Sequence, residues 1–189
     1  YHNVFQSAVV YDEPQDLLII DGVEKRIDEN GVTVGPLDMG RITYTRQEAR
    51  DLVNKCYIAL VAVPTDPKKD GTLDMGIVES VVDWLDTDLI LIKSALMPGT
   101  VDKLVEKTGK NIAVSVEFIG MGKYYTPPHK YPDPLDPQKH NMMIIGGELD
   151  TATRCAEVLW DKMSPDIRIH LLTAKEAELT KLIENAYGA

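Results

Sequence analysis

The sequence predicts an α/β fold, with a doubly wound, mostly parallel sheet that leads into a long helix at the C-terminal end. Short apolar runs rich in β-branched residues alternate along the 189 residues with segments of helical periodicity. The runs are continuously apolar, which is typical of strands covered on both faces, and their alternation with helices is typical of a parallel sheet.

Six apolar runs are predicted to be strands. Each is followed by a polar residue, a proline or a glycine, which marks the point where the chain leaves the sheet. The runs cover residues 7–11, 57–63, 88–92, 111–116, 142–145 and 168–172.

Helices are predicted between these runs, at residues 46–55, 74–85, 100–107, 150–163 and 173–187. Thr100 follows Pro98-Gly99 and is expected to be the N-cap of its helix. Thr173 precedes Glu176 by three residues, a capping-box pattern that predicts where the last helix begins.

Two stretches interrupt the alternation. Residues 17–34 are predicted to be a small β insertion, with hairpin turns at Asp21-Gly22 and Asn30-Gly31. Residues 124–140 hold five prolines and cannot form regular structure. This segment is either a solvated connector or a loop shaped around a ligand.

Composition excludes several function classes. The formal net charge of −10 argues against nucleic acid or an acidic membrane surface as a partner. No apolar run approaches the roughly 18 residues of a membrane helix, and no signal peptide is visible at Tyr1. Two cysteines and four scattered histidines form no disulfide framework and no metal site. We therefore expect a soluble, cytoplasmic protein without a bound metal.

Candidate site residues follow the predicted strands, because ligands of parallel α/β sheets bind beyond the carboxyl ends of the strands. Asp12 ends the first run in the manner of an acid that binds a ribose hydroxyl pair, although a turn residue before Pro14 is an equal alternative. The glycine fingerprint expected about twenty residues upstream of such an acid is absent, because the chain starts only eleven residues before Asp12.

Three further residues could carry chemistry. Glu117 directly follows a strand and could be a general base, a water-positioning group or a structural partner of a cation. Lys181 and Asn185 are four residues apart, hence on one helix face, where they could hold a developing oxyanion. The alternative for this pair is an ordinary solvent-exposed face.

Five segments, taken together and in order, resemble the UDP-glucose/GDP-mannose dehydrogenase family. They are V-P-T-D-P at 63–67 with D-G-T at 70–72, K-S-A-L-M-P-G-T at 93–100, S-V-E-F-I-G-M-G at 115–122, I-I-G-G at 144–147 and A-E-L-T-K-L-I-E-N-A at 177–186. The resemblance extends from about Ile42 to the C-terminus.

This resemblance implies a Rossmann-like NAD-binding domain over residues 1–172, without its first strand and glycine loop, and the start of a central, dimer-forming helix over 173–189. It implies two successive NAD-dependent oxidations of a nucleotide sugar, with UDP-glucose to UDP-glucuronate as the expected reaction and a homodimer as the expected assembly. A cysteine thiohemiacetal and then a thioester are the family's intermediates.

The resemblance also implies roles for single residues. The cofactor would be bound by Asp12, Val63, Pro64, Thr65 and Ser94. Glu117 would serve the hydrolytic water, Phe118 and Ile119 would hold the nucleotide sugar, and Lys181 with Asn185 would stabilise the oxyanion.

The sequence departs from the family pattern at several positions. Ala95 replaces a threonine, Val116 a proline and Met121 an acid, and the F-G-G-x-C segment that carries the nucleophilic cysteine is absent. We therefore expect the 189-residue chain by itself to be inactive. Two alternatives stay open: a catalytically eroded nucleotide-binding relative, and an NAD(P)-dependent dehydrogenase of the 3-hydroxyacid or 6-phosphogluconate type.

Overall fold

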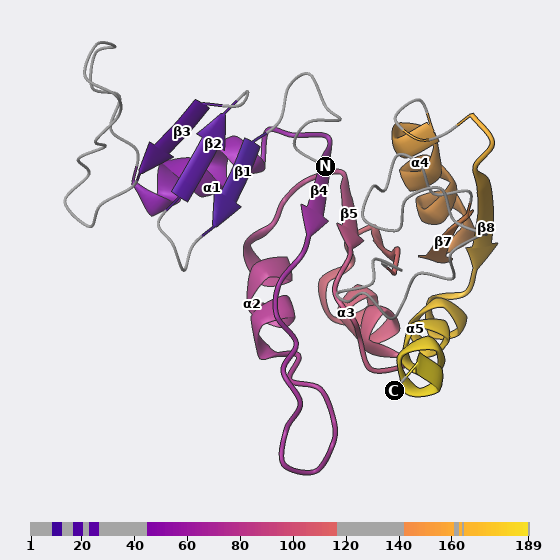
Figure 1. Ribbon diagram of the computed structural model, residues 1–189. Coiled ribbons are helices and arrows are strands. Elements are labelled where there is room, and N and C mark those ends of the chain that lie inside the picture. Colours follow the sequence, from indigo (N-terminus) through magenta and orange to yellow (C-terminus); the bar gives the residue numbers. More distant parts are fainter. Residues whose placement is uncertain are drawn as a thin grey trace. The chain divides into compact units, whose positions relative to one another are not determined.

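The chain forms two compact units, Tyr1–Ala59 with Trp84–Thr87 and Leu60–Asp83 with Asp88–Ala189. The structure, a computed structural model shown in Figure 1, describes residues 9–12, 17–20, 23–26, 45–116, 142–160, 163 and 165–188.

The first unit contains a three-stranded antiparallel sheet in the order β1-β2-β3, formed by Val9–Asp12, Leu17–Ile20 and Val23–Arg26. Ile20 pairs with Val23, so the strands of the hairpin predicted around Asp21-Gly22 are confirmed. The second predicted turn, at Asn30-Gly31, and the proline-rich segment 124–140 lie outside the described residues.

The prediction that the first apolar run joins the parallel sheet is wrong, since β1 pairs antiparallel with β2 from Val9 opposite Ile20 to Asp12 opposite Leu17. Only four residues separate the two strands. A connection of this length permits antiparallel pairing, whereas parallel pairing needs a crossover of a dozen or more residues. An apolar run indicates a strand but does not select its partner.

Helix α1, Arg46–Val53, belongs to the same unit and begins at a capping box. Glu48 N–H donates to the hydroxyl of the N-cap Thr45 at 3.2 Å, and Thr45 N–H donates to the Glu48 carboxylate at 2.7 Å. At the other end, the side chain of Asn54 donates to the Trp84 carbonyl and accepts from the Asp86 N–H. The capping box satisfies N–H groups that a helix start leaves without partners, and Asn54 links the end of α1 to Trp84 and Asp86.

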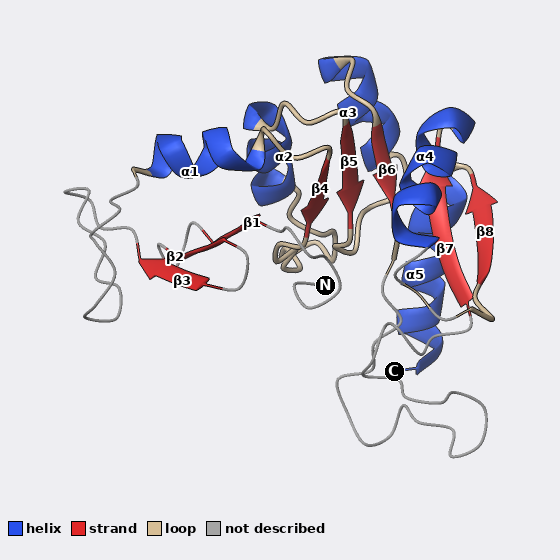
Figure 2. Ribbon diagram, turned by 90° about the horizontal axis from the view of Figure 1, so that it is seen from above, coloured by secondary structure: helices blue, strands red, loops and turns tan. Residues whose placement is uncertain are grey.

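The second unit is built on a five-stranded sheet in the order β4-β5-β6-β7-β8. The prediction of a mostly parallel sheet is confirmed: β5 and β6 are parallel, as are β7 and β8, and the one antiparallel pair among those registers joins β6 to β7. Figure 2 shows β5 and β6 pointing one way and β7 and β8 the other. The strands are Ile58–Val61, Leu89–Ile92, Ile112–Val114, Met142–Gly147 and Arg168–Leu172.

Four helices accompany this sheet: α2 (Gly76–Trp84), α3 (Thr100–Thr108), α4 (Leu149–Trp160) and α5 (Ala174–Gly188). Helix α4 contacts β5 through β8, α5 contacts β6 and β7, and α3 contacts β6. Every residue of β5 and β6 is buried, as their continuous apolar runs predict. Strand β8 departs from this expectation, because it is the edge strand and its residues are exposed or half-buried.

Helix starts were predicted with mixed success. The capping box of α5 is confirmed, with Glu176 N–H donating to the Thr173 hydroxyl at 3.4 Å and Thr173 N–H donating to the Glu176 carboxylate at 2.9 Å. The N-cap of α3 is Gly99, in a left-handed conformation, and not Thr100. Thr100 instead donates its hydroxyl to the Met97 carbonyl at 2.6 Å.

Strand β7 and helix α5 pack so closely at Gly146 that no side chain fits between them. A Cβ there would lie 2.4 Å from Ala177 Cβ and 2.8 Å from the Thr173 carbonyl oxygen. We expect Gly146→Ala to lower the free energy of unfolding by about 1–3 kcal/mol, the usual cost of overpacking a core, in urea titrations followed by circular dichroism. Gly76→Ala is the control, because a Cβ at Gly76 would meet only the Asp74 carboxylate, at 3.3 Å. Equal stability of the two variants would show that α5 can shift away from the sheet.

Candidate active site at the carboxyl ends of the strands

The hydroxyl of Ser94 joins the carboxyl ends of β4 and β5. It accepts a hydrogen bond from the Val63 N–H at 2.9 Å and donates one to the Val63 carbonyl at 2.7 Å. Ser94 is buried, whereas Pro64 is exposed and Thr65 half-buried. Four of the predicted cofactor-binding residues therefore lie together. The Ser94 hydroxyl fixes the turn at Val63 as both a donor and an acceptor.

A second polar link joins the ends of β5 and β6. Lys93 is only 7% exposed, and its ammonium donates to the hydroxyl of the fully buried Ser115 at 2.9 Å. The backbone of Lys93 also donates to the Val61 carbonyl, and Ser115 N–H donates to the Ile92 carbonyl. A buried ammonium needs such partners, because burial of an unpaired charge is costly. Polar side chains thus connect the ends of the three strands, in addition to the backbone hydrogen bonds of the sheet.

Helix α5 carries the two residues predicted to stabilise an oxyanion. The Lys181 side chain is 15% exposed and its ammonium donates to the Glu184 carboxylate at 2.7 Å, whereas Asn185 is exposed. The alternative of an ordinary solvated face therefore does not describe Lys181. Lys175, six residues earlier on the same helix, is 67% exposed and pairs with Asp102 at 3.4 Å.

Four predicted site residues are not among those described at these strand ends. Glu117, Phe118 and Ile119 lie outside the described residues. Asp12 ends β1 and pairs with Leu17 in the sheet of the first unit, whereas Val63 and Ser94 belong to the second unit.

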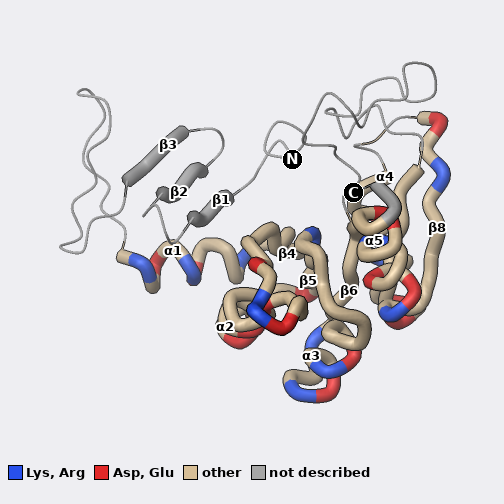
Figure 3. The backbone as a smooth tube through the Cα atoms, turned by 60° about the horizontal axis from the view of Figure 1, so that its bottom comes forward, with Lys and Arg blue, Asp and Glu red and all other residues tan. Residues whose placement is uncertain are grey.

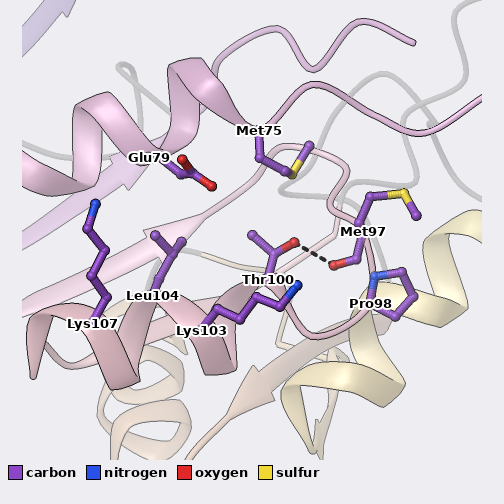
Figure 4. Close-up of a pocket in the computed structure, with 8 residues that line it drawn as sticks. All are labelled: Met75, Glu79, Met97, Pro98, Thr100, Lys103, Leu104 and Lys107. Atoms are coloured by element: carbon purple, nitrogen blue, oxygen red, sulfur yellow. Dashed lines mark hydrogen bonds between the residues drawn. The ribbon is translucent and has the colours of Figure 1, made fainter. Parts of the chain in front are cut away.

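A pocket of about 400 Å³ lies between α2 and α3 in the second unit. Figure 4 shows Met75 and Glu79 on one side, Leu104 and Lys107 on the other, and Met97 in the turn before α3. None of the ten predicted site residues lines it. The pocket therefore does not coincide with the predicted cofactor site.

Charged residues of both signs occur on the helices of the second unit. In Figure 3, acidic and basic residues are interspersed along α3 and α5 rather than separated by sign. Within the described part of the chain, no cluster of three or more His, Cys, Asp or Glu is arranged to hold a metal ion. None of the helices described there is long and apolar enough to cross a membrane.

Comparison with known proteins gives consistent results, although no model of a known protein family matches the chain. A UDP-N-acetyl-D-mannosamine dehydrogenase of Methanocaldococcus jannaschii is 26% identical, over 91% of this chain and 42% of the relative. A UDP-glucose dehydrogenase structure from Pyrobaculum islandicum superposes with a TM-score of 0.58 at 25% identity, over 78% of this chain and 35% of that one. A Pyrococcus horikoshii UDP-D-ManNAc dehydrogenase structure, at 24% identity and a TM-score of 0.55, supports the fold.

The relatives that match this chain are nucleotide-sugar dehydrogenases. The family resemblance of the five sequence segments is thereby confirmed, and so is the Rossmann-like α/β fold. The chain spans less than half the length of the relatives that it matches.

Three residues of the second unit were given no role by the sequence. Lys93 directly follows a predicted strand, but nothing in the sequence pairs it with Ser115, 22 residues away. Glu184 could have been found, because acidic and basic residues three positions apart on a helix are neighbours. Glu178 is fully buried and bonds to backbone groups 77 and 79 residues distant, which no local pattern indicates.

Cys155 is fully buried in α4, and burial raises the pKa of its thiol to about 12. Because the thiolate is the reactive form, on the order of one molecule in 10⁴ would be ionised at pH 8. We expect iodoacetamide at pH 8 to leave Cys155 unmodified in the native protein and to alkylate it fully in 6 M guanidinium, measured by peptide mass spectrometry. Half-buried Cys56 is the internal comparison. Rapid native alkylation of Cys155 would contradict its assignment as a core residue.

Proposed function

We propose that the protein is an NAD-dependent nucleotide-sugar dehydrogenase that oxidises the C6 hydroxyl of a UDP-linked hexose to a carboxylate. The observation that carries the proposal is the double hydrogen bond of Ser94 to Val63, which builds a fixed polar edge beyond the carboxyl ends of β4 and β5. Ligands of α/β sheets bind at such an edge.

The residues at this edge fit a dinucleotide. Exposed Pro64 and half-buried Thr65 offer an open turn, and half-buried Ala95 follows Ser94 without a bulky side chain. Val63, Pro64, Thr65 and Ser94 would hold the cofactor here, and Asp12 is proposed as its ribose acid by resemblance. NAD, when bound, would accept hydride from the sugar carbon.

The chain's own residues would then manage charge and water. As a carbonyl carbon is attacked, negative charge develops on its oxygen, and the Lys181 ammonium with the Asn185 amide would stabilise that charge. The Glu184 carboxylate orients the ammonium beforehand through its 2.7 Å hydrogen bond. Glu117 is proposed to position the hydrolytic water, and Phe118 with Ile119 to hold the nucleotide sugar. Cys155 is too deeply buried to act as the nucleophile.

The sugar is proposed only as a class. UDP-glucose is the substrate expected from the sequence, while the curated relatives carry the name UDP-N-acetyl-D-mannosamine dehydrogenase. Both sugars present a C6 hydroxyl, so the chemistry is shared.

An exposed apolar pair supports the proposal of a homodimer through α5. Leu179 is 47% exposed and Ile183 57% exposed, and they lie four residues apart on one face of the helix. Pairing of this face with that of a second copy would remove both side chains from water. A cytoplasmic location is part of the same proposal.

The proposal is tested by incubating the full-length natural protein with NAD and either UDP-glucose or UDP-N-acetylmannosamine, following NADH at 340 nm. We expect two NADH per sugar with one of the substrates, because an alcohol requires two hydride removals to become a carboxylate. Absence of NADH with both sugars, from protein that binds NAD, would favour a catalytically eroded relative. Activity on 3-hydroxyacids or 6-phosphogluconate instead would place the protein in another class of dehydrogenase.

Lys181→Ala in the full-length enzyme tests the oxyanion role. We expect kcat to fall by about 10²–10³-fold, the usual effect of losing one preorganised donor. The matched control is Lys175→Ala on the same helix, which removes only an exposed ion pair of the kind usually worth less than about 1 kcal/mol. Equal effects of the two substitutions on kcat, or a loss explained by a lower melting temperature, would leave Lys181 without a catalytic role.

A further inference from the structure

Glu178 is a carboxylate that is fully buried where α5 meets the start of α3. One carboxylate oxygen accepts from the Gly99 N–H at 2.5 Å and the other from the Val101 N–H at 2.8 Å. Both oxygens of the side chain are therefore bound to backbone amides of one helix N-terminus. None of the roles proposed above uses this residue.

The N-terminus of α3 explains why a carboxylate is stable there. The N-cap, Gly99, has φ of +87° and no side chain, so α3 cannot cap itself. A negative charge is favoured at this end of a helix, and charge-assisted hydrogen bonds to N–H groups are stronger than neutral ones. Burial raises the pKa of Glu178, as does the nearby Asp102 carboxylate, whereas the hydrogen bonds from Val101 and Gly99 oppose the increase. Glu178 thus replaces the missing cap from another helix.

A second contact joins the same two helices, but at the surface. Lys175 pairs with Asp102 in the first turn of α3, with both side chains more than half exposed. A Cβ at Gly99 would lie 3.3 Å from Lys175 Cε, so the helices approach closely at this point. The buried Glu178 bonds carry more of the connection, since an exposed ion pair contributes little.

The position of Glu178 connects two parts of the proposed active site. On α5, Glu178, Lys181 and Asn185 are spaced i, i+3 and i+7, so they share one face. On the other side, Gly99 ends the loop that follows β5 and contains Ser94. We infer that Glu178 is a positioning residue, which fixes the Lys181 face of α5 against the Ser94–Gly99 loop. This inference rests on the proposed function.

Glu178→Gln tests the inference in the full-length enzyme, because the amide keeps the shape but turns an NH₂ group toward one of the two backbone N–H donors. We expect kcat to fall by about 10–100-fold, as small misplacements of catalytic groups do, with KM for the nucleotide sugar changed less. In a Lys181→Ala background the same substitution should cost less than about threefold, since residues that act as a unit are not additive. Hydrogen exchange of residues 94–101 and 179–185 should accelerate by at least about tenfold in both segments.

Two further variants complete the test. Glu178→Asp keeps the charge and is one methylene shorter, so it should show the same coupling if the Gln variant does not fold. Lys175→Gln, which removes the exposed link between the same helices, should change neither kcat nor exchange. Multiplicative losses with Lys181→Ala, or unchanged exchange in the 179–185 segment, would overturn the inference.

The exchange measurement separates this inference from the proposed function. If the wild type forms no NADH while Glu178→Gln accelerates exchange in both segments, the link between α5 and the loop stands and the enzymatic proposal fails. If the wild type is active and Glu178→Gln leaves kcat and exchange unchanged, the enzymatic proposal stands and the positioning role is wrong.

Discussion

The abrupt change from apolar to polar residues at the end of β5 is the constraint on which the rest of the second unit depends. Leu89, Ile90, Leu91 and Ile92 have no exposed surface, and Lys93 and Ser94 follow directly while still buried. Polar groups in such a place must find protein partners, because water does not reach them. Ser94 bonds to Val63, which follows β4, and Lys93 bonds to Ser115, which follows β6. Burial of the strand therefore forces the three strand ends into one preorganised edge.

Much of this architecture could be predicted from local sequence signals. Continuous apolar runs predicted β5 and β6, and the Thr173–Glu176 spacing predicted the start of α5, because both signals act within a few residues. The predicted strand ends indicated where polar residues would gather, and Ser94 forms hydrogen bonds to Val63 there.

The failures share a physical cause, which is dependence on distant parts of the chain. The predicted pairing of β1 was wrong because an apolar run does not specify whether the strand pairs with its neighbour in sequence or with a distant strand. The N-cap of α3 was wrong because the cap is supplied by Glu178 rather than by the neighbouring Thr100. The exposure of β8 follows from its place at the sheet edge, which composition does not record. Long-range geometry chooses among locally equivalent options in each case.

The antiparallel pairing of β6 with β7 has a consequence for where α5 delivers its side chains. Val114 of β6 lies opposite Gly146 of β7, which in turn lies opposite Leu172 at the end of β8. Strands β7 and β8 run opposite to β5 and β6. A helix that follows β8 and turns back over Gly146 therefore runs in the same direction as β5 and β6. Seven residues of helix after Ala174, at about 1.5 Å each, carry Lys181 roughly 10 Å up the sheet, toward the edge where β5 ends. With the last two strands parallel to the first ones, a helix that returns over Gly146 would run the other way and carry Lys181 away from the end of β5.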